Sequence, residues 1–425
     1  MKRSQISQMR SDLGVFMGGD LLYEAYQAQS DMLAPARALA EMTSSTFRDT
    51  NFGPAGNYFF RALVAGAEIF SRTRLSHERP DYRIDSVAVE GRDVEVTEEV
   101  LLDSPFGQLL HFRKATNLHQ PRVLIVAPMA GHFATLLRHT ARTMLSDHDV
   151  YITDWKSARD VPLSMGRFGV DDYIDHLIGF FERIGPGAHV MAVCQPCAAL
   201  LAAVAVMSEA GNPAAPRSMT LMAGPVDTSV NPTEVNRAAN KHPLEWFENN
   251  LITTVPSRFP GAGRKVYPGF LQISAFMAMN MPRHWRAHMD LYGHLIRGNT
   301  KKADANKKFY DEYLAVSDLP ADFFLETVKN VFQEYHLPRG QFQYRGVPIN
   351  PAAIRKTWLL TVEGEKDDIC SVGQTVAAHD LTPGIKPFRK KHYVQAGVGH
   401  YGVFSGTRWA TQIYPVVRSL IMAAD

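Results

Sequence analysis

HVMAVCQPCAAL, residues 189–200, runs from an apolar segment into two of the chain's three cysteines and then into small apolar residues. Its first five residues have the apolar character of a strand that is buried on both faces of a parallel sheet. A helix is expected over about 195–207, because Pro196 suits the first helical turn, where its missing N–H costs nothing. The stretch therefore predicts a tight strand-to-helix turn with Cys194 at its apex.

Strands and helices are expected to alternate on both sides of this turn. Strand-like apolar runs occur at 123–127, 149–155, 218–224 and 356–369, with helical patterns between them. Such alternation predicts an α/β protein with a doubly wound, mostly parallel sheet and helices on both faces. Residues 81–114 alternate apolar and polar side chains instead, which predicts antiparallel strands.

Two segments lie outside this alternation. Residues 1–80 carry apolar side chains at helical spacing and form a predicted N-terminal helical segment. Residues 226–345 hold helical patterns, many aromatic residues and prolines, but no obvious strand pairs. We expect them to form an inserted helical cap, or lid. The α/β core then consists of residues 81–225 and 346–425.

The composition narrows the class of protein. The chain has 425 residues, of which 45% are hydrophobic, and this is ample material for a large core. A formal net charge of +2 without a basic block gives nucleic-acid binding no electrostatic support. Three cysteines do not make a disulfide framework. No apolar signal region follows Lys2 and Arg3, and the longest clean apolar run, 198–207, is too short to cross a bilayer. We expect a cytoplasmic protein without a transmembrane segment, and the oligomeric state stays open, a homo-oligomer included.

Two roles other than catalysis compete for Cys194. A structural zinc site needs four ligands, and no second C-x-x-C or H-x-H accompanies this motif, so no metal is predicted. C-x-P-C between a strand and a helix is also typical of thioredoxin-like redox centres. In those small domains, however, the motif comes early, whereas here it follows three predicted strand–helix pairs.

The third role is that of a nucleophile, and the rest of the chain favours it. In hydrolases with such a turn, an acid and then a histidine follow at the ends of later strands. Asp367 and His400 fit that order, and each comes just beyond a predicted strand, where open α/β sheets place their sites. Asp368 competes with Asp367, but the G-x-x-D spacing favours Asp367. His392 competes with His400, but it lies within a predicted strand.

Backbone donors for a developing oxyanion are also predicted. In such hydrolases one donor is the N–H of the residue after the nucleophile, here Gln195. The second is expected from the loop after strand 123–127, which reads PMAGHF, as the N–H of Met129 or Ala130.

Together these motifs resemble the intracellular poly(3-hydroxybutyrate) (PHB) depolymerases. The resemblance extends over roughly residues 10–420 and is carried by AVCQP (192–196), TVEGEKDDI (361–369), GVGHYGVFSG (397–406) and APMAGHFATLLR (127–138). It implies an α/β-hydrolase fold with Cys194 as nucleophile, Asp367 as acid and His400 as base, and no resident cofactor. Cys197 lies outside the motif and is not implied as catalytic.

The resemblance also implies a reaction and its partners. Ester bonds of PHB would be cleaved through a thioester acyl-enzyme, with the polymer or granule surface and 3-hydroxybutyrate oligomers as partners, and with water or coenzyme A as acyl acceptor. A polyhydroxyalkanoate synthase-like acyltransferase is an alternative, although synthases usually carry glycines where Ala192 and Pro196 stand. A small-ester or thioester esterase, a thiol-disulfide oxidoreductase and a non-catalytic granule-binding protein are the others. Residues 268–289, rich in Met, Phe and Trp, either contact the apolar polymer or form the cap's own core.

Overall fold

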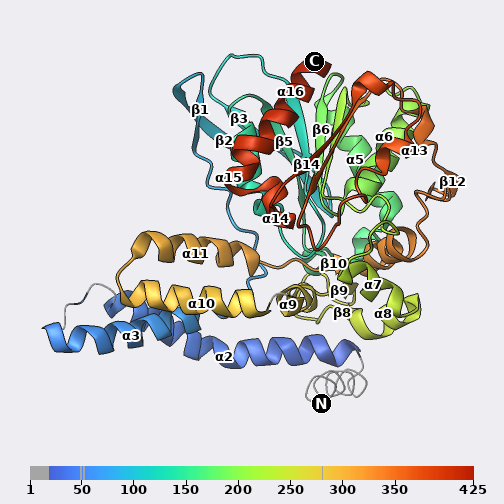
Figure 1. Cartoon of the computed structure of the whole chain (residues 1–425). Helices are drawn as coiled ribbons and strands as arrows, with labels where there is room; N and C mark the ends of the chain where they lie inside the picture. Colours follow the sequence, from blue (N-terminus) through green and yellow to red (C-terminus); the bar gives the residue numbers. More distant parts are fainter. Residues whose placement is uncertain (1–18, 48–49, 51–52, 280) are drawn as a thin grey trace.

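The computed structural model describes residues 19–47, 50, 53–279 and 281–425, and Figure 1 shows their arrangement. Within these residues, the main sheet has nine strands in the order β1-β2-β3-β5-β4-β6-β7-β13-β14. Its strands are β1 (Ser86–Val89), β2 (Arg92–Asp103), β3 (Gly107–Lys114), β4 (Arg122–Val126), β5 (Asp149–Trp155), β6 (His189–Val193), β7 (Ser218–Met222), β13 (Trp358–Gly364) and β14 (Lys390–Gln395). From β5 to β14 all neighbours are parallel, whereas β1, β2 and β3 join as an antiparallel edge. The predicted mostly parallel sheet and its antiparallel neighbour are confirmed.

Strand β6 shows why the sheet is covered on both faces. All five of its residues are buried. Val190 and Ala192 belong to the apolar cluster that includes α5 and α6, whereas Met191 and Val193 pack with α4 and α16. Because successive side chains of a strand point to opposite faces, one short apolar run serves two cores. The flanking helices are α4 (Arg138–Met144), α5 (Val170–Ile184), α6 (Cys197–Glu209), α13 (Ala378–Leu381), α14 (His400–Phe404), α15 (Gly406–Arg408) and α16 (Tyr414–Ala424).

Short 3-10 and π turns complete this layer. They are η1 (Ala134–Leu137), η2 (Ala158–Asp160), η3 (Leu163–Met165), η5 (Pro351–Ala353), η6 (Pro387–Arg389) and the π turn η7 (Trp409–Ile413).

Residues 226–345 connect β7 to its sheet neighbour β13, so the chain leaves the sheet and returns to it. Their helices are α7 (Glu234–Lys241), α8 (Leu244–Leu251), α9 (Gly269–Met279), α10 (Met281–Ile296), α11 (Thr300–Tyr313) and α12 (Ala321–Thr327), which continues into the π turn η4 (Val328–Gln333). The segment is not purely helical, because it also holds five short strands. They are β8 (Thr253–Thr254), β9 (Lys265–Tyr267), β10 (Leu319–Pro320), β11 (Gln343–Tyr344) and β12 (Val347–Pro348).

The expectation that this segment lacks strand pairs is therefore wrong. Strands β10, β9 and β8 form a small antiparallel sheet, and β11 pairs with β12. At two or three residues each, these strands are too short for the alternation of apolar and polar side chains to be visible in the sequence.

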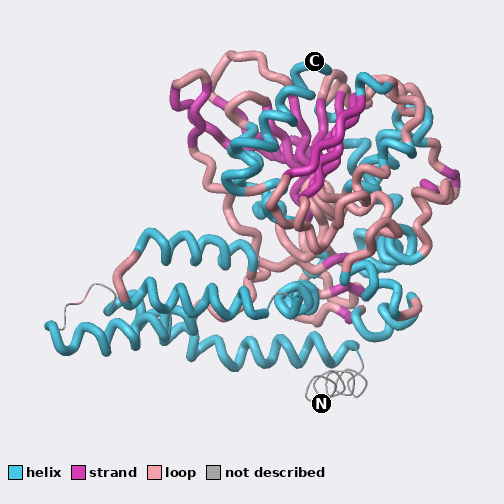
Figure 2. Tube along the Cα trace, in the orientation of Figure 1, coloured by secondary structure: helices cyan, strands magenta, loops and turns pink. Residues whose placement is uncertain are grey.

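The N-terminal helices form an arm with two helices of the inserted segment. In Figures 1 and 2, α2 (Gly19–Phe47) and α3 (Gly53–Ser71) extend beside α10 and α11, away from the sheet. The hydroxyl of Tyr23 on α2 donates to Oδ2 of the buried Asp318 at 2.6 Å. Arg72 lies 2.6 Å from Asp311 on α11. Residues 1–18 of the predicted N-terminal segment lie outside the described residues, and the division into domains at 80, 225 and 345 stays a prediction.

Candidate active site

Cys194 directly follows β6 and stands in the turn that leads into α6. Its φ is 66°, in the left-handed region that residues other than glycine seldom occupy. The Cys194 N–H donates to the carbonyl of Met222 on the neighbouring strand β7 at 2.8 Å, which ties the turn to the sheet. Such a strained strand-to-helix turn raises the side chain at its apex above the sheet. In agreement, Cys194 is only half-buried.

Cys197, the other cysteine of the C-x-x-C motif, is packed inside the protein. It is fully buried, and its Sγ lies 3.6 Å from the carbonyl of Ala192. Gly224 approaches so closely that a Cβ there would lie 2.1 Å from this sulfur. Burial raises the pKa of the Cys197 thiol, and neither it nor Cys194 is in a disulfide. Because a buried, protonated thiol is a poor resolving partner, the geometry does not favour a redox centre.

Asp367 lies in the turn that follows β13. Its N–H donates to the carbonyl of Gly364 at 3.2 Å, as the G-x-x-D spacing predicts. Its Oδ1 accepts the backbone N–H groups of Ile369 and Cys370 at 2.9 and 2.8 Å. Its Oδ2 lies 2.8 Å from Nδ1 of His400. Both carboxylate oxygens are thus held, so the orientation of the group is fixed.

His400 is the first residue of α14, beyond the glycine-rich turn that follows β14. Its side chain is 5% exposed. Burial by itself lowers the pKa of the imidazole, but the charges of Cys194 and Asp367, with side-chain hydrogen bonds to both, raise the pKa well above its ordinary value. The fold therefore brings the three predicted residues together, with His400 in contact with the other two.

The competing residues lie elsewhere. Asp368 is exposed to solvent. Nδ1 of His392 pairs with the hydroxyl of Thr361 at 2.9 Å, and its Nε2 lies 3.6 Å from Glu363. His392 therefore has partners within the sheet and none in the pair formed by Asp367 and His400.

The predicted oxyanion donors meet beside the turn. Met129 and Ala130 lie in the loop after β4, which bends at Gly131 with a φ of 84°. The N–H of Met129 donates to Oε1 of the Gln195 side chain at 3.1 Å. For the part of the chain that the structure describes, no hydrogen bond is found from the N–H of Gln195 or of Ala130. The loop and the turn are thus close enough for their N–H groups to serve one bound oxygen, and a protein oxygen now holds one of them.

Aromatic side chains enclose the histidine. The rings of Tyr401 and Phe404 lie 5.9 and 5.7 Å from that of His400. Tyr401 in turn packs on the apolar cluster of α9 and α11, where the ring of Tyr313 lies 6.5 Å away. His132, 5.3 Å from Tyr313, is buried, and burial lowers its pKa to about 4, so its ring is neutral at pH 7. The inserted segment therefore contributes to the walls around the candidate site.

Two features of the site were missed by sequence reasoning. The first is the hydrogen bond between Gln195 and Met129, since a side-chain contact across 66 residues leaves no pattern. The second is Glu363, a fully buried carboxylate that accepts the N–H groups of Gly373, Thr375 and Val376. It orders the loop that follows Asp367. An acidic residue within the apolar run 358–364 was a visible signal of such a role.

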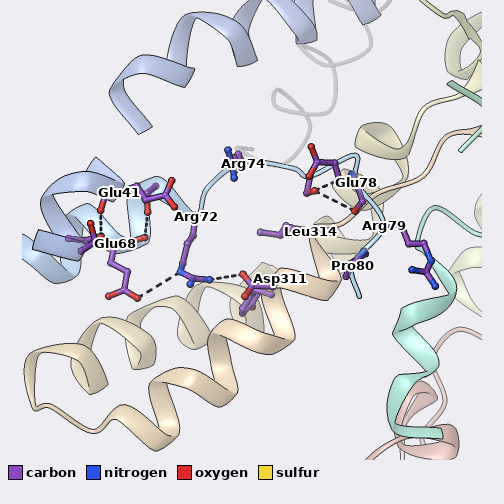
Figure 3. A pocket seen from close by; sticks show the side chains of 14 residues that line it. Glu41, Glu68, Arg72, Arg74, Glu78, Arg79, Pro80, Asp311 and Leu314 are labelled. Atoms are coloured by element: carbon purple, nitrogen blue, oxygen red, sulfur yellow. Dashed lines mark hydrogen bonds and ion pairs between the residues drawn. The ribbon is translucent and has the colours of Figure 1, made fainter. Parts of the chain in front are cut away.

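A separate pocket lies on the arm. Figure 3 shows it between α2, α3 and α11, with a volume of ≈ 400 Å³. Its lining includes Glu68, Arg72 and Asp311, which form ion pairs with one another, but none of the predicted site residues. It is therefore distinct from the site at Cys194.

Two further observations concern metals and membranes. Nowhere in the described ranges do three or more His, Cys, Asp or Glu side chains gather as a metal site would require. Likewise, no helix that the structure describes combines the length and the hydropathy needed to cross a lipid bilayer.

Comparison with protein families gives one match. Residues 223–425 match the model described as PHB de-polymerase C-terminus. Asp367 and His400 lie within the matched residues, whereas Cys194, Gln195 and the loop at 129–130 precede them. No curated protein matches the chain.

Solved structures resemble the chain only distantly. A monoacylglycerol lipase from Paleococcus ferrophilus has 11% identity and a TM-score of 0.42, over 72% of this chain and 97% of the lipase. A thermophilic esterase from Thermogutta terrifontis has 13% identity and a TM-score of 0.38, over 79% and 97%. A 2-hydroxy-6-oxo-6-phenylhexa-2,4-dienoate hydrolase from Rhodococcus sp. strain RHA1 has 13% identity and a TM-score of 0.40, over 78% and 99%. Scores this low leave the fold to be defined by the strand order itself.

The strand order and the family match lead to one conclusion. The sheet has the order and the strand-to-helix turn of an α/β-hydrolase, and the C-terminal residues match a depolymerase model. The chain is a PHB depolymerase-like α/β-hydrolase, and its activity is that of a carboxylic ester hydrolase.

Proposed function

We propose that the chain is an intracellular polyhydroxyalkanoate depolymerase that cleaves the ester bonds of poly(3-hydroxybutyrate) with Cys194, His400 and Asp367. The observation that carries the proposal is the position of His400, which contacts the sulfur of Cys194 and lies 2.8 Å from the carboxylate of Asp367. This is the relation of nucleophile, base and orienting acid that acyl transfer requires. The match of residues 223–425 to the depolymerase model supports the choice of substrate.

The first half-reaction forms a thioester. With His400 protonated, the sulfur of Cys194 attacks the ester carbonyl carbon as a thiolate. The carbonyl double bond opens, and its oxygen takes the negative charge, which the N–H groups of Gln195 and of Met129 or Ala130 stabilise. His400 gives its proton to the leaving alkoxide as the carbon–oxygen bond breaks. The acyl group is then held on Cys194.

The second half-reaction restores the enzyme. His400, now neutral, takes a proton from water, whose oxygen attacks the thioester. The carbon–sulfur bond breaks, the carboxylic acid leaves, and the thiolate and the imidazolium form again. Asp367 stays ionised throughout and holds the ring through Nδ1. Coenzyme A in place of water would yield an acyl-coenzyme A, so analysis of the product distinguishes the two acceptors.

A stripe of apolar side chains supports contact with the polymer. Met281, Trp285 and Met289 follow one another at intervals of four residues along α10 and are 50%, 70% and 52% exposed. Side chains four residues apart share one face of a helix. Earlier in the same stretch, Phe270 and Ile273 are buried. Residues 268–289 thus divide into a core part and an exposed part, and we propose that the exposed part lies on the polyester at the granule surface.

One comparison tests the function against its alternatives. Wild type and Cys194→Ala are assayed on amorphous PHB granules and on a soluble ester such as p-nitrophenyl butyrate. A depolymerase clears the granules, and the variant does not. Activity on the soluble ester alone would favour a small-ester hydrolase, and incorporation of 3-hydroxybutyryl-coenzyme A into polymer would favour a synthase-like acyltransferase. Granule binding without turnover of either substrate would favour the non-catalytic protein.

A further inference from the structure

We infer that the side chain of Gln195 occupies the oxyanion hole of the free enzyme and is displaced when an ester reacts. This inference rests on the proposed function and adds a competitor within the same site. It starts from one contact, the 3.1 Å hydrogen bond from the N–H of Met129 to Oε1 of Gln195. The donor expected to bind the substrate's oxygen is therefore bound to an oxygen of the protein.

The atom in that position resembles the substrate chemically. Oε1 of Gln195 is a carbonyl oxygen on an sp² carbon, as is the ester oxygen that must occupy the hole. Gln195 also supplies the other expected donor through its backbone N–H, directly after Cys194. One residue thus presents a donor to the hole and fills it with its own acceptor.

The side chain is able to leave. In the described part of the chain, the contact with Met129 is the one hydrogen bond that the Gln195 side chain makes. Gln195 is only half-buried, so its amide can turn toward water and be hydrated there. Displacement thus exchanges one neutral hydrogen bond for another, without leaving a buried polar group unsatisfied.

This competition distinguishes the ground state from the transition state. A neutral ester carbonyl binds the Met129 N–H about as strongly as the glutamine carbonyl does, so it gains little by replacing it. An oxyanion binds the same donor roughly twice as strongly, because hydrogen bonds to ionised acceptors are the stronger ones. The Gln195 side chain therefore weakens ester binding more than it hinders the reaction, and differential binding of this kind favours catalysis.

Two variants with opposite expected effects test the inference. Gln195→Met keeps the length of the side chain without its acceptor, so the hole is empty. Its kcat/KM on p-nitrophenyl butyrate should rise about five-fold, chiefly through a lower KM. Gln195→Glu puts a charged acceptor on the Met129 N–H, so its kcat/KM should fall at least ~100-fold. Gln195→Ala repeats the removal with a short side chain, and thermal unfolding identifies any variant that is misfolded.

A second measurement probes the hole directly. Butyraldehyde adds to the thiolate of Cys194 and forms a hemithioacetal whose oxygen occupies the oxyanion hole. Its inhibition constant should fall in Gln195→Met and rise in Gln195→Glu.

Other outcomes contradict the inference. If the side chain served only to hold the loop at 129–131, Gln195→Met would lose kcat, and Gln195→Glu, which keeps an acceptor, would retain most of it. Changes of less than two-fold in both variants would also exclude a competitor in the hole. Cys194→Ala on the same ester tests the nucleophile separately, so a failure of the proposed function is distinguished from a failure of the Gln195 inference.

Discussion

Oδ2 of Asp367 lies 2.8 Å from Nδ1 of His400, and almost none of either side chain reaches solvent. The carboxylate therefore fixes one ring nitrogen and leaves the other for the sulfur. Asp367→Asn should lower kcat about 10³- to 10⁴-fold on a soluble ester, because the amide favours the wrong tautomer. Its exposed neighbour gives the matched control, and Asp368→Asn should stay within two-fold of wild type. Equal losses in the two variants would assign the acid incorrectly.

The two cysteines of the C-x-x-C motif should respond differently to replacement. Cys194→Ala should abolish ester hydrolysis with little change in unfolding temperature, since the side chain is only half-buried. Cys197→Ser should keep most of the activity, because its hydroxyl still finds the carbonyls of Ala192 and Met222. The assay is initial rate on p-nitrophenyl butyrate. Loss of turnover in Cys197→Ser with unchanged folding would instead favour redox chemistry.

The raised pKa of His400 predicts how the sulfur reacts with pH. Because the imidazole stays protonated well above its ordinary pKa of about 6.5, the adjacent sulfur remains a reactive thiolate in mildly acid solution. Alkylation of Cys194 by iodoacetamide at pH 6 should therefore slow at least ~10-fold in His400→Asn. Mass spectrometry of the labelled peptides measures the rate, and the buried Cys197 and Cys370 should stay unlabelled.

The same shift sets a direction for stability. A group whose folded pKa is raised stabilises the fold fully below its unfolded pKa, and the contribution is lost as pH rises through the folded value. The difference in unfolding free energy between wild type and His400→Asn should thus be largest near pH 6 and shrink toward alkaline pH. Urea unfolding at a series of pH values measures it. A gap that widens with pH would contradict the ion pair.

Gly224 should tolerate no side chain. A Cβ there would lie 2.1 Å from the sulfur of Cys197 and 2.8 Å from the carbonyl of Cys194. Gly224→Ala should therefore destabilise the protein by about 3 kcal/mol and displace the turn that carries the nucleophile. Gly179 on α5 is the control, because nothing lies within 4 Å of a Cβ placed there. Gly179→Ala should be neutral or stabilise by up to about 1 kcal/mol, as measured by urea unfolding.

Trp285 should matter for the polymer and not for small esters. Trp285→Ser removes the most exposed member of the stripe on α10, so adsorption to amorphous PHB and its hydrolysis should fall several-fold while hydrolysis of p-nitrophenyl butyrate stays unchanged. Phe388 is similarly exposed, at 65%, but lies beside Trp358 at the opposite end of the sheet from Cys194. Phe388→Ser should leave both activities intact. Equal effects of the two substitutions would exclude a specific polymer contact.

The parts of the fold that depend on local pattern could be predicted. The buried run of β6 and the turn at Cys194 followed from residues 189–200 alone, and so did the order of cysteine, acid and histidine. Asp367 could be preferred over Asp368 because the G-x-x-D turn directs the first carboxylate inward, and the structure leaves Asp368 exposed.

Features that depend on contacts between distant residues could not be predicted. The pairing of β9 with β8 and β10 needs only two or three residues from each strand, fewer than any periodicity requires. The bond between Gln195 and Met129 and the grip of Glu363 on the following loop arise only when separate loops meet. Sequence patterns show which backbone groups are present, but only the tertiary structure shows which of them are already bound.

Tyr23 and Asp318 fasten the beginning of the chain to the inserted segment, and Arg72 and Asp311 do so again farther along. Helices α2 and α3 are therefore coupled mechanically to the segment whose aromatic residues surround His400. Any motion that uncovers Cys194 by shifting α9 to α11 has to drag this N-terminal pair along, as a door drags its frame when the two are bolted together. Deleting the first two helices should thus change access to the sulfur, although neither helix supplies a side chain to the chemistry.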